Sequence, residues 1–269
     1  MKIVVLGASG MLGSAFFRQW EGRYNVTFLA RDPDVFGRDK NQITKWDYYG
    51  KSVYGLPRAD YYINCVGVIK PFMTNTLNGI RLNSVFPHEL AAHCDDIGAK
   101  LIHITTDCVF SGKSVVPYVE ISTHDAEDTY GKSKSLGEPE GVMVLRTSIV
   151  GQELHKNSSL LAWYLQQPPN ITVNGYRNHL WNGMTTDEYV RVCEKIITKD
   201  MYEPSIFHIF SDTVTKFDLL CLFEQRFKRG VNVVATTAPQ SVYRVLSTTK
   251  DLNTKLGIRS LREQIMAIQ

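Results

Sequence analysis

The stretch that indicates the fold is IVVLGASGMLG, residues 3–13. A β-branched apolar run leads into glycines at positions 7, 10 and 13 and then into a helix-like segment. This order lets backbone amides approach a pyrophosphate at a helix N-terminus. The spacing is GxxGxxG rather than GxGxxG, so a plain tight turn between strand and helix is the alternative. The position directly after a first strand favours nucleotide binding.

The rest of the chain repeats the alternation of strand and helix. Strand-like runs at 2–7, 25–30, 61–66, 100–105 and 142–147 alternate with helix-like segments near 11–22, 76–97 and 130–138. This rhythm predicts an α/β fold with a Rossmann-type, doubly wound parallel sheet. Further helices are expected near 185–199, after a Thr185 to Glu188 capping pattern, and near 216–228, with loops at 167–170 and 174–175. We expect a dinucleotide-binding domain over 1–150 and a smaller substrate lobe over 151–269, some segments of which return to the main domain.

Two of the predicted strands end in polar residues. One ends at Thr105 and Thr106, and another ends at Asn64 before a small loop. Ligands of open α/β sheets bind beyond the carboxyl ends of the strands, so both ends should lie at the edge of one site. Alternatively, the threonines only cap the strand or start a turn.

The segment YGKSK, residues 130–134, places a tyrosine and a lysine four positions apart. On a helix the two side chains share one face, about one turn apart. A nearby ammonium should lower the pKa of a phenol from ~10 and favour its ionised form. Tyr-x-x-x-Lys also arises by chance in helices, and it gains weight here from the strand and glycine motifs. The pair is therefore a candidate general acid.

These motifs together carry a family resemblance. GASGMLG (7–13), INCVG (63–67), ITTDCVFSG (104–112), YGKSKSLGE (130–138) and VLRTS (144–148) resemble the extended short-chain dehydrogenase/reductases. They are most similar to the dTDP-4-dehydrorhamnose reductases and related sugar-nucleotide reductases, over nearly the whole chain. The resemblance implies reduction of a nucleotide-linked 4-keto-6-deoxysugar in polysaccharide biosynthesis. An epimerase with the same residues and a non-catalytic, NADP-binding regulatory subunit stay open as alternatives.

The resemblance also implies residue roles. The catalytic group is Thr106, Tyr130 as proton donor and Lys134, which also holds the nicotinamide ribose. The cofactor residues are Gly7, Ser9, Gly10, Met11, Gly13, Arg31, Asp47, Asn64, Val66, Gly67, Asn83 and Lys134. The candidate substrate contacts are Thr106, Asp107, Cys108 and Ile149, and we add Trp181 and Asn182 as candidates to supply replacement contacts. Cys108 and Ile149 stand where related reductases usually carry aromatic residues, which leaves the sugar open. Trp181 has lobe packing as its alternative role.

The order of residues after the second strand bears on the cofactor. An acidic residue there would bind the ribose 2′-hydroxyl of NAD, whereas arginine suits the 2′-phosphate of NADP. Arg31 comes first and Asp32 second. We therefore expect NADP(H), with NAD(H) as the alternative.

Composition narrows the class of protein. The net charge is only +3, with no basic block, so no nucleic-acid partner is expected. Five scattered cysteines without a C-x-x-C pair favour reduced thiols in a cytoplasmic protein, and no apolar run approaches ~20 residues, so no membrane span is predicted. His88 and His93 lie five positions apart and not four, so we expect no metal site. The oligomeric state is open, and a homodimer is one option.

Overall fold

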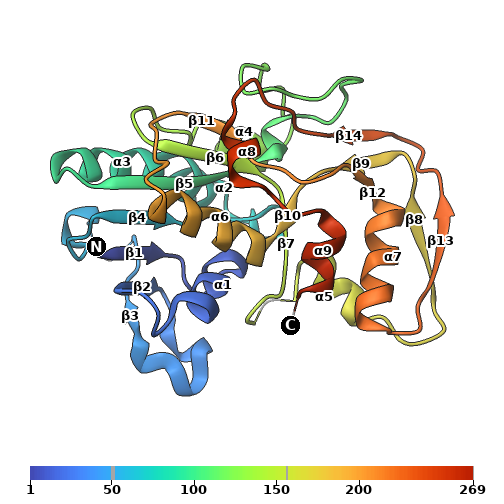
Figure 1. Cartoon of the computed structure of the whole chain (residues 1–269), viewed down its shortest axis with the longest axis horizontal. Helices are drawn as coiled ribbons and strands as arrows, with labels where there is room; N and C mark the ends of the chain where they lie inside the picture. The colour runs from blue at the N-terminus through green and yellow to red at the C-terminus, as the bar shows by residue number, and fades with distance from the viewer. Residues whose placement is uncertain (50–51, 156, 269) are drawn as a thin grey trace.

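The computed structural model describes residues 1–49, 52–155 and 157–268, and Figure 1 shows its arrangement. Within these ranges, seven parallel strands form one sheet. In spatial order they are β11 (Ile206–His208), β6 (Met143–Thr147), β5 (Lys100–Thr106), β4 (Tyr61–Asn64), β1 (Ile3–Leu6), β2 (Val26–Ala30) and β3 (Ile43–Lys45). The predicted fold class and the five predicted strands are confirmed. β3 and β11 are additions of three residues each, too short to show a periodic pattern.

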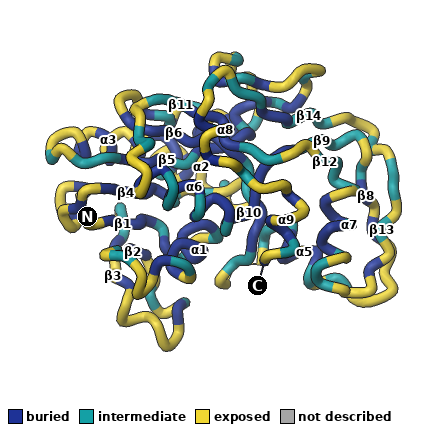
Figure 2. The backbone as a smooth tube through the Cα atoms, in the orientation of Figure 1, coloured by how far each residue is buried: buried dark blue, intermediate teal, exposed yellow. Residues whose placement is uncertain are grey.

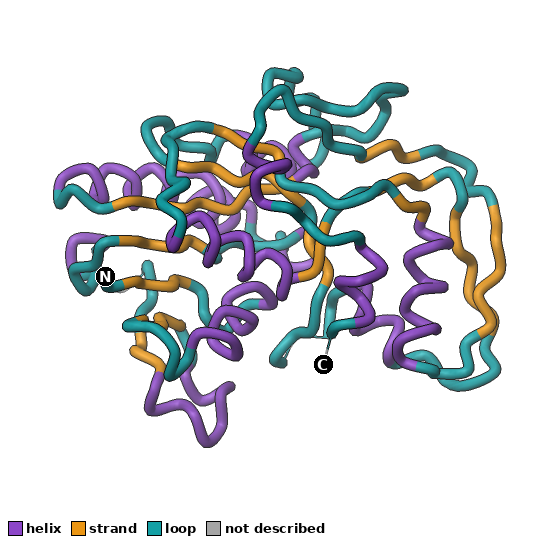
Figure 3. The backbone as a smooth tube through the Cα atoms, viewed as in Figure 1, coloured by secondary structure: helices purple, strands orange, loops and turns teal. Residues whose placement is uncertain are grey.

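The sheet is buried on both faces, as expected of a parallel sheet between helices. Successive side chains of a strand point to opposite faces, so Ile3 and Val5 join one core while Val4 and Leu6 join the other. The first core lies under α1 (Met11–Trp20), α6 (Thr186–Thr198) and α8 (Leu252–Leu256), and the second lies under α3 (Phe86–Asp96). Figure 2 shows that the strands of the sheet are mostly buried, and Figure 3 shows the helices that flank them.

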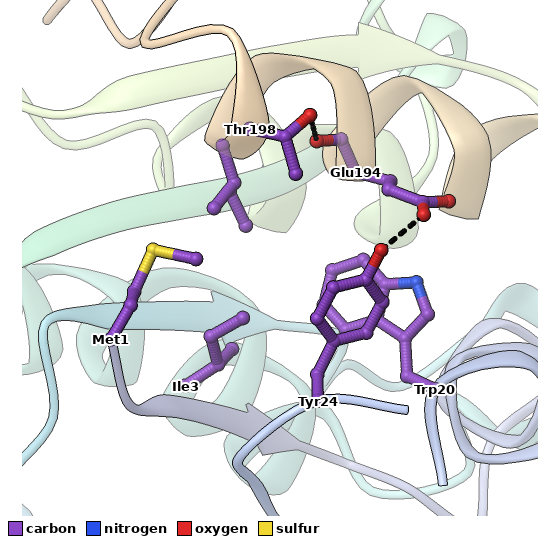
Figure 4. Close-up of a pocket in the computed structure, with 7 residues that line it drawn as sticks. Met1, Ile3, Trp20, Tyr24, Glu194 and Thr198 are labelled. Carbon is purple, nitrogen blue, oxygen red and sulfur yellow. Dashed lines mark hydrogen bonds between the residues drawn. The ribbon is translucent and has the colours of Figure 1, made fainter. Parts of the chain in front are cut away.

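Segments of the second half of the chain return to this sheet. β11 pairs with β6, and α6 packs beside α1. Figure 4 shows part of this contact, where the Tyr24 hydroxyl donates a hydrogen bond to Glu194 and Trp20 lies beside them. The space enclosed by these side chains has no room for a water molecule. The division of the chain at residue 150 stays a prediction.

The helix predicted at 76–97 is one run with an irregular middle. α2 (Thr76–Ile80) continues through a π-helical segment, Arg81–Val85, into α3. Pro87 has no N–H, so it cannot donate to the carbonyl of Asn83 four residues earlier. That carbonyl lies instead against Gly137, where a Cβ would be 1.7 Å from the Asn83 oxygen. The π segment thus brings Asn83 close to the helix that carries Tyr130.

Most of the remaining elements form a smaller layer beside the sheet, whose outer strands are seen on the right of Figure 1. Its strands are β8 (Thr172–Tyr176) with β13 (Asn232–Thr236), β9 (His179–Trp181) with β12 (Val214–Thr215) and β14 (Val242–Arg244), and β7 (Ile149–Val150) with β10 (Met184–Thr185). Its helices α5 (Leu160–Leu165), α7 (Lys216–Phe227) and α9 (Leu261–Met266) share a third core. In the described part of the chain, no helix has the length and hydropathy to cross a bilayer.

The prediction of a loop at 174–175 is wrong. Both residues lie within β8 and pair with β13. Asn-Gly is a strong turn signal, but Gly175 serves here to let α7 come close. A Cβ at that position would lie 2.7 Å from the Cα of Phe217. The loop predicted at 167–170 is confirmed. The predicted capping pattern at the start of α6 is confirmed as well, because the Thr185 hydroxyl accepts a hydrogen bond from the Glu188 amide.

Candidate active site

The glycine-rich loop between β1 and α1 is shaped by close backbone contacts. Gly7 has a left-handed φ of 80°, and a Cβ there would lie 2.9 Å from the carbonyl carbon of Cys65. A Cβ at Gly13 would lie 2.1 Å from the Gly7 oxygen. Only glycine fits both positions. Gly13 therefore lets the helix pack on the loop, while Gly7 lets the loop pack on the turn after β4.

A cleft of about 810 Å³ lies beyond the carboxyl ends of the strands, where ligands of such sheets bind. The predicted site residues that line it are Gly7, Ser9, Gly10, Met11, Arg31, Asp47, Val66, Gly67, Thr106, Cys108, Tyr130, Lys134 and Ile149. The cleft thus runs from the glycine loop and the end of β2 to the end of β5 and the helix that carries Tyr130.

Thr106, Tyr130 and Lys134 meet on one wall of this cleft. Tyr130 and Lys134 lie one turn apart on α4 (Thr129–Ser135), as predicted. The Thr106 hydroxyl accepts a hydrogen bond from the Cys108 amide, 3.1 Å away. α4 comes close to this turn because its third residue is a glycine: a Cβ at Gly131 would lie 2.3 Å from the Cys108 carbonyl oxygen.

The predicted lowering of the Tyr130 pKa is wrong. Burial raises that pKa, and the neighbouring Cys108 thiol raises it further, whereas a hydrogen bond with Thr106 lowers it less. The Lys134 charge is not among the groups that act most strongly on the phenol. Tyr130 therefore keeps its proton at neutral pH, which suits a proton donor rather than a base.

Lys134 is a buried cation, 6% exposed. Burial lowers its pKa to about 8, and the carboxylate of Glu138 and the thiol of Cys65 oppose that shift. Its ammonium lies against Gly67, where a Cβ would come within 2.8 Å of Nζ. The missing side chain at Gly67 is what leaves space for the ammonium at the cleft wall.

Two residues predicted to bind the cofactor are fully buried and support the wall from behind. Asn64 accepts a hydrogen bond from the Val66 amide, 2.9 Å away, and its own amide group lies 3.0 Å from His103 Nδ1. Asn83 bonds the amide and the carbonyl of Val68 at 2.8 and 2.9 Å. Their polar atoms are used within the protein, so a direct contact with a cofactor has no support in the geometry.

Asp107, a predicted substrate contact, is also buried. Burial raises the pKa of its carboxyl group, and the Arg244 charge and a hydrogen bond from the Thr106 hydroxyl, 3.2 Å long, oppose that shift. Arg244 donates long hydrogen bonds to the carbonyls of Phe110 and Ser111, at 3.3 and 3.4 Å. The pair holds the turn that carries Thr106 and Cys108.

Trp181 and Asn182 are not among the residues that line the cleft. Trp181 packs against the third core and lies over Gly183. Asn182 is 2% exposed, and its amide group bonds both the amide and the carbonyl of Leu246, at 2.9 and 2.8 Å. The packing alternative fits Trp181, and Asn182 joins two segments of the lobe.

At the other end of the cleft, Arg31 and Asp32 differ in what they bond. The Asp32 carboxylate accepts a hydrogen bond from the Asp34 amide, 3.1 Å away, and so caps the segment Pro33–Gln42. Arg31 is exposed at the cleft. Asp47 lines the cleft as well, and its carboxylate accepts a hydrogen bond from the Tyr49 amide at 3.3 Å.

Sequence reasoning missed several cleft residues, among them Tyr48, Ser148 and Glu153. Burial, followed by a hydrogen bond with Glu89, raises the pKa of Tyr48 to about 12. Glu153 accepts hydrogen bonds from the backbone amides of Ser158 and Ser159 at 2.6 and 2.7 Å. The serine pair before the apolar 160–165 segment was an available sign of a capped helix.

The model of one family, RmlD substrate binding domain, matches residues 1–241 of this chain. The chain belongs to this family. The resemblance found in the motifs is therefore confirmed at the family level. Among curated relatives of this RmlD-family protein, the β subunit of methionine adenosyltransferase 2 from Xenopus tropicalis is 28% identical over 247 residues, 84% of this chain and 72% of that subunit.

A dTDP-4-dehydrorhamnose reductase of Mycobacterium tuberculosis is 29% identical over 147 residues, 51% of this chain and 44% of the reductase. The matched region thus spans less than half the length of such biosynthetic relatives. The crystal structure of dTDP-4-dehydrorhamnose reductase from Bacillus anthracis in complex with NADP superimposes with a TM-score of 0.75 at 17% identity, over 98% of each chain. This likeness supports the Rossmann-type fold.

Proposed function

We propose that this RmlD-family protein is an NADP(H)-dependent reductase of a 4-keto-6-deoxysugar attached to a nucleotide. The observation that carries the proposal is the meeting of Thr106, Tyr130 and Lys134 on one wall of a cleft whose other end is the glycine loop. A reductase of this kind needs a proton donor beside the carbonyl and a cofactor site within reach of it. The likeness to curated dTDP-4-dehydrorhamnose reductases supports the sugar class.

The glycine loop is the part that fits a dinucleotide. Gly7 and Gly10 line the cleft at the start of α1, and the N-terminus of a helix favours a pyrophosphate. Arg31 is exposed at the cleft, where its charge suits a 2′-phosphate, whereas the Asp32 carboxylate caps the segment that follows it. These observations support NADP(H), with NAD(H) as the weaker alternative.

When bound, the nicotinamide supplies a hydride from its C4 atom to the ketone carbon. The Tyr130 hydroxyl donates its proton to the ketone oxygen as that oxygen gains charge, so the carbonyl becomes an alcohol. In the structure the Thr106 hydroxyl accepts a hydrogen bond from the Cys108 amide and donates one to Asp107. With the substrate bound, it would donate to the ketone oxygen instead of to Asp107. The Lys134 ammonium lies against Gly67 on the same wall of the cleft, and it is the group that would hold the nicotinamide ribose.

The test is turnover on a panel of nucleotide-linked 4-keto sugars, dTDP-4-dehydrorhamnose among them, with NADPH or NADH in excess. We expect stoichiometric oxidation of NADPH together with formation of the corresponding deoxysugar alcohol. An epimerase would instead convert the sugar without net oxidation of the cofactor. NADPH binding without turnover of any member of the panel would remove the reductase assignment.

A second candidate is a non-catalytic regulatory subunit. The matches to methionine adenosyltransferase 2 β subunits extend over 84% of this chain, further than the reductase matches. A regulatory subunit needs no proton donor, so the presence of Thr106, Tyr130 and Lys134 in one cleft counts against this role. A stable complex with a methionine adenosyltransferase catalytic subunit, formed equally well by a Tyr130→Phe variant, would favour it.

A further inference from the structure

A buried pair of polar side chains joins two neighbouring strands beneath the cleft. Asn64, the last residue of β4, is the register partner of His103 in β5. Both are 0% exposed, and Asn64 Nδ2 lies 3.0 Å from His103 Nδ1. Burying an amide and an imidazole is costly unless they are hydrogen-bonded, so this contact has to be made in one defined way.

The chemistry of the neighbours fixes the direction of each bond. The Val66 amide can only donate, so the Asn64 atom 2.9 Å from it is the oxygen Oδ1. The Asn64 NH₂ group therefore faces His103, whose Nδ1 must accept while its Nε2 carries the proton. Burial, aided by the Lys134 charge, holds the pKa of His103 well below its usual range, so the ring is neutral and the acceptor is permanent.

This chain of bonds ends at the cleft wall. The turn at residues 65–67, called here the 65–67 turn, packs against Gly7 on one side, where a Cβ would lie 3.0 Å from the Val66 nitrogen. On the other side Gly67 lies against the Lys134 ammonium. Val66 and Gly67 both line the cleft. The 65–67 turn therefore sets the spacing between the glycine loop and Lys134.

We propose that His103 is a positioning residue for cofactor binding: through Asn64 it holds the 65–67 turn in the conformation that accepts the nicotinamide end of NADP(H). The inference rests on the proposed cofactor function. His103 itself is 0% exposed and is not among the residues that line the cleft. If the turn samples other conformations, the apparent affinity for the cofactor falls by the fraction of molecules that remain competent.

The test compares three variants by NADPH titration and by thermal unfolding. His103→Leu removes the acceptor, and it should weaken NADPH binding roughly tenfold, as expected for loss of one buried hydrogen bond. His103→Asn places Oδ1 where Nδ1 was, and it should bind NADPH several-fold more tightly than His103→Leu. Leu101→Ala, on the same strand and buried in the second core, should lower the melting temperature without changing NADPH affinity. His103→Gln, whose amide reaches the Nε2 position instead, replaces His103→Leu if that variant does not fold.

Hydrogen exchange at the Val66 amide provides a readout independent of the cofactor. We expect faster exchange of the 65–67 turn in His103→Leu than in His103→Asn or Leu101→Ala. Parent-like NADPH affinity in His103→Leu, or equal loss in Leu101→Ala, would overturn the inference. If the unmodified protein does not bind NADPH, the proposed function fails by itself. In that case unchanged Val66 exchange in His103→Leu would still refute the link from His103 to the turn.

Discussion

Replacing Lys134 by methionine should stabilise the protein at neutral pH while turnover falls. Lys134 is 6% exposed, and its burial lowers its pKa from 10.5 to about 8. Because the unfolded chain would hold this proton more tightly than the folded protein, folding carries a cost whenever the lysine is charged. Methionine has a similar length and no charge, so it removes that cost.

The size of the effect follows from the pKa. At about 1.4 kcal/mol for each pH unit, lowering it from 10.5 to about 8 costs the folded protein about 3 kcal/mol at neutral pH. Between the two values the unfolded chain binds more protons, so the stability of the parent protein rises as the pH increases through this window. The advantage of Lys134→Met should therefore be largest at neutral pH and shrink by about 3 kcal/mol toward high pH.

Urea unfolding of both proteins at a series of pH values measures this difference, and shifts common to both cancel. Lys132→Met is the matched control, because Lys132 is exposed on the same helix. Its difference from the parent should not depend on pH in this range. A Lys134→Met protein that is less stable than the parent at neutral pH, or whose advantage does not change with pH, would refute the reasoning.

Four further outcomes are expected. Tyr130→Phe should lose about 10²–10⁴-fold in turnover with unchanged NADPH affinity, measured by steady-state kinetics and titration, and unchanged turnover would remove the phenol from the mechanism. Arg31→Ala should weaken NADPH roughly tenfold and leave NADH unaffected, since a charge-assisted bond to the 2′-phosphate is lost; equal affinities in the parent would shift the assignment to Asp32 and NAD. Trp181→Ala should lower stability by about 2 kcal/mol with KM for the sugar nucleotide unchanged, and a raised KM with intact stability would return it to the substrate site. Gly131→Ala should reduce both stability and turnover, because its Cβ would meet the Cys108 oxygen at 2.3 Å, and a parent-like melting temperature would contradict that contact.

Local chemistry explains what could be predicted from the sequence. The five long strands, the glycine turn after residue 6 and the helix at Tyr130 are each specified by residues adjacent in the chain. The small strands are different. β8 pairs with a strand about sixty residues later, and the Asn-Gly signal within it pointed to a turn. Only the close packing of Phe217 on Gly175 shows why an extended strand is stable there.

The candidate site likewise has a part that could be predicted from the sequence and a part that could not. The family resemblance groups Thr106, Tyr130 and Lys134, and the four-residue spacing places the last two on one helix face. The sequence does not show that burial of the phenol is the largest influence on its pKa. Asn64 and Asn83 were predicted to contact the cofactor. A polar residue at such a position either contacts a ligand directly or supports another residue that contacts it. Which of the two applies depends on bonding partners distant in sequence, such as His103, whose role no local pattern suggests.

The helix that carries Tyr130 and Lys134 is held by its backbone at both ends. Gly131 lies against the Cys108 carbonyl of the turn after β5, and Gly137 lies against the Asn83 carbonyl of the π-helical segment. Neither contact uses a side chain that lines the substrate end of the cleft. Residues such as Ile149, which also lines the cleft, are therefore not part of the contacts that position Tyr130. We therefore expect substitutions at Ile149 to leave the position of Tyr130 relative to Thr106 unchanged.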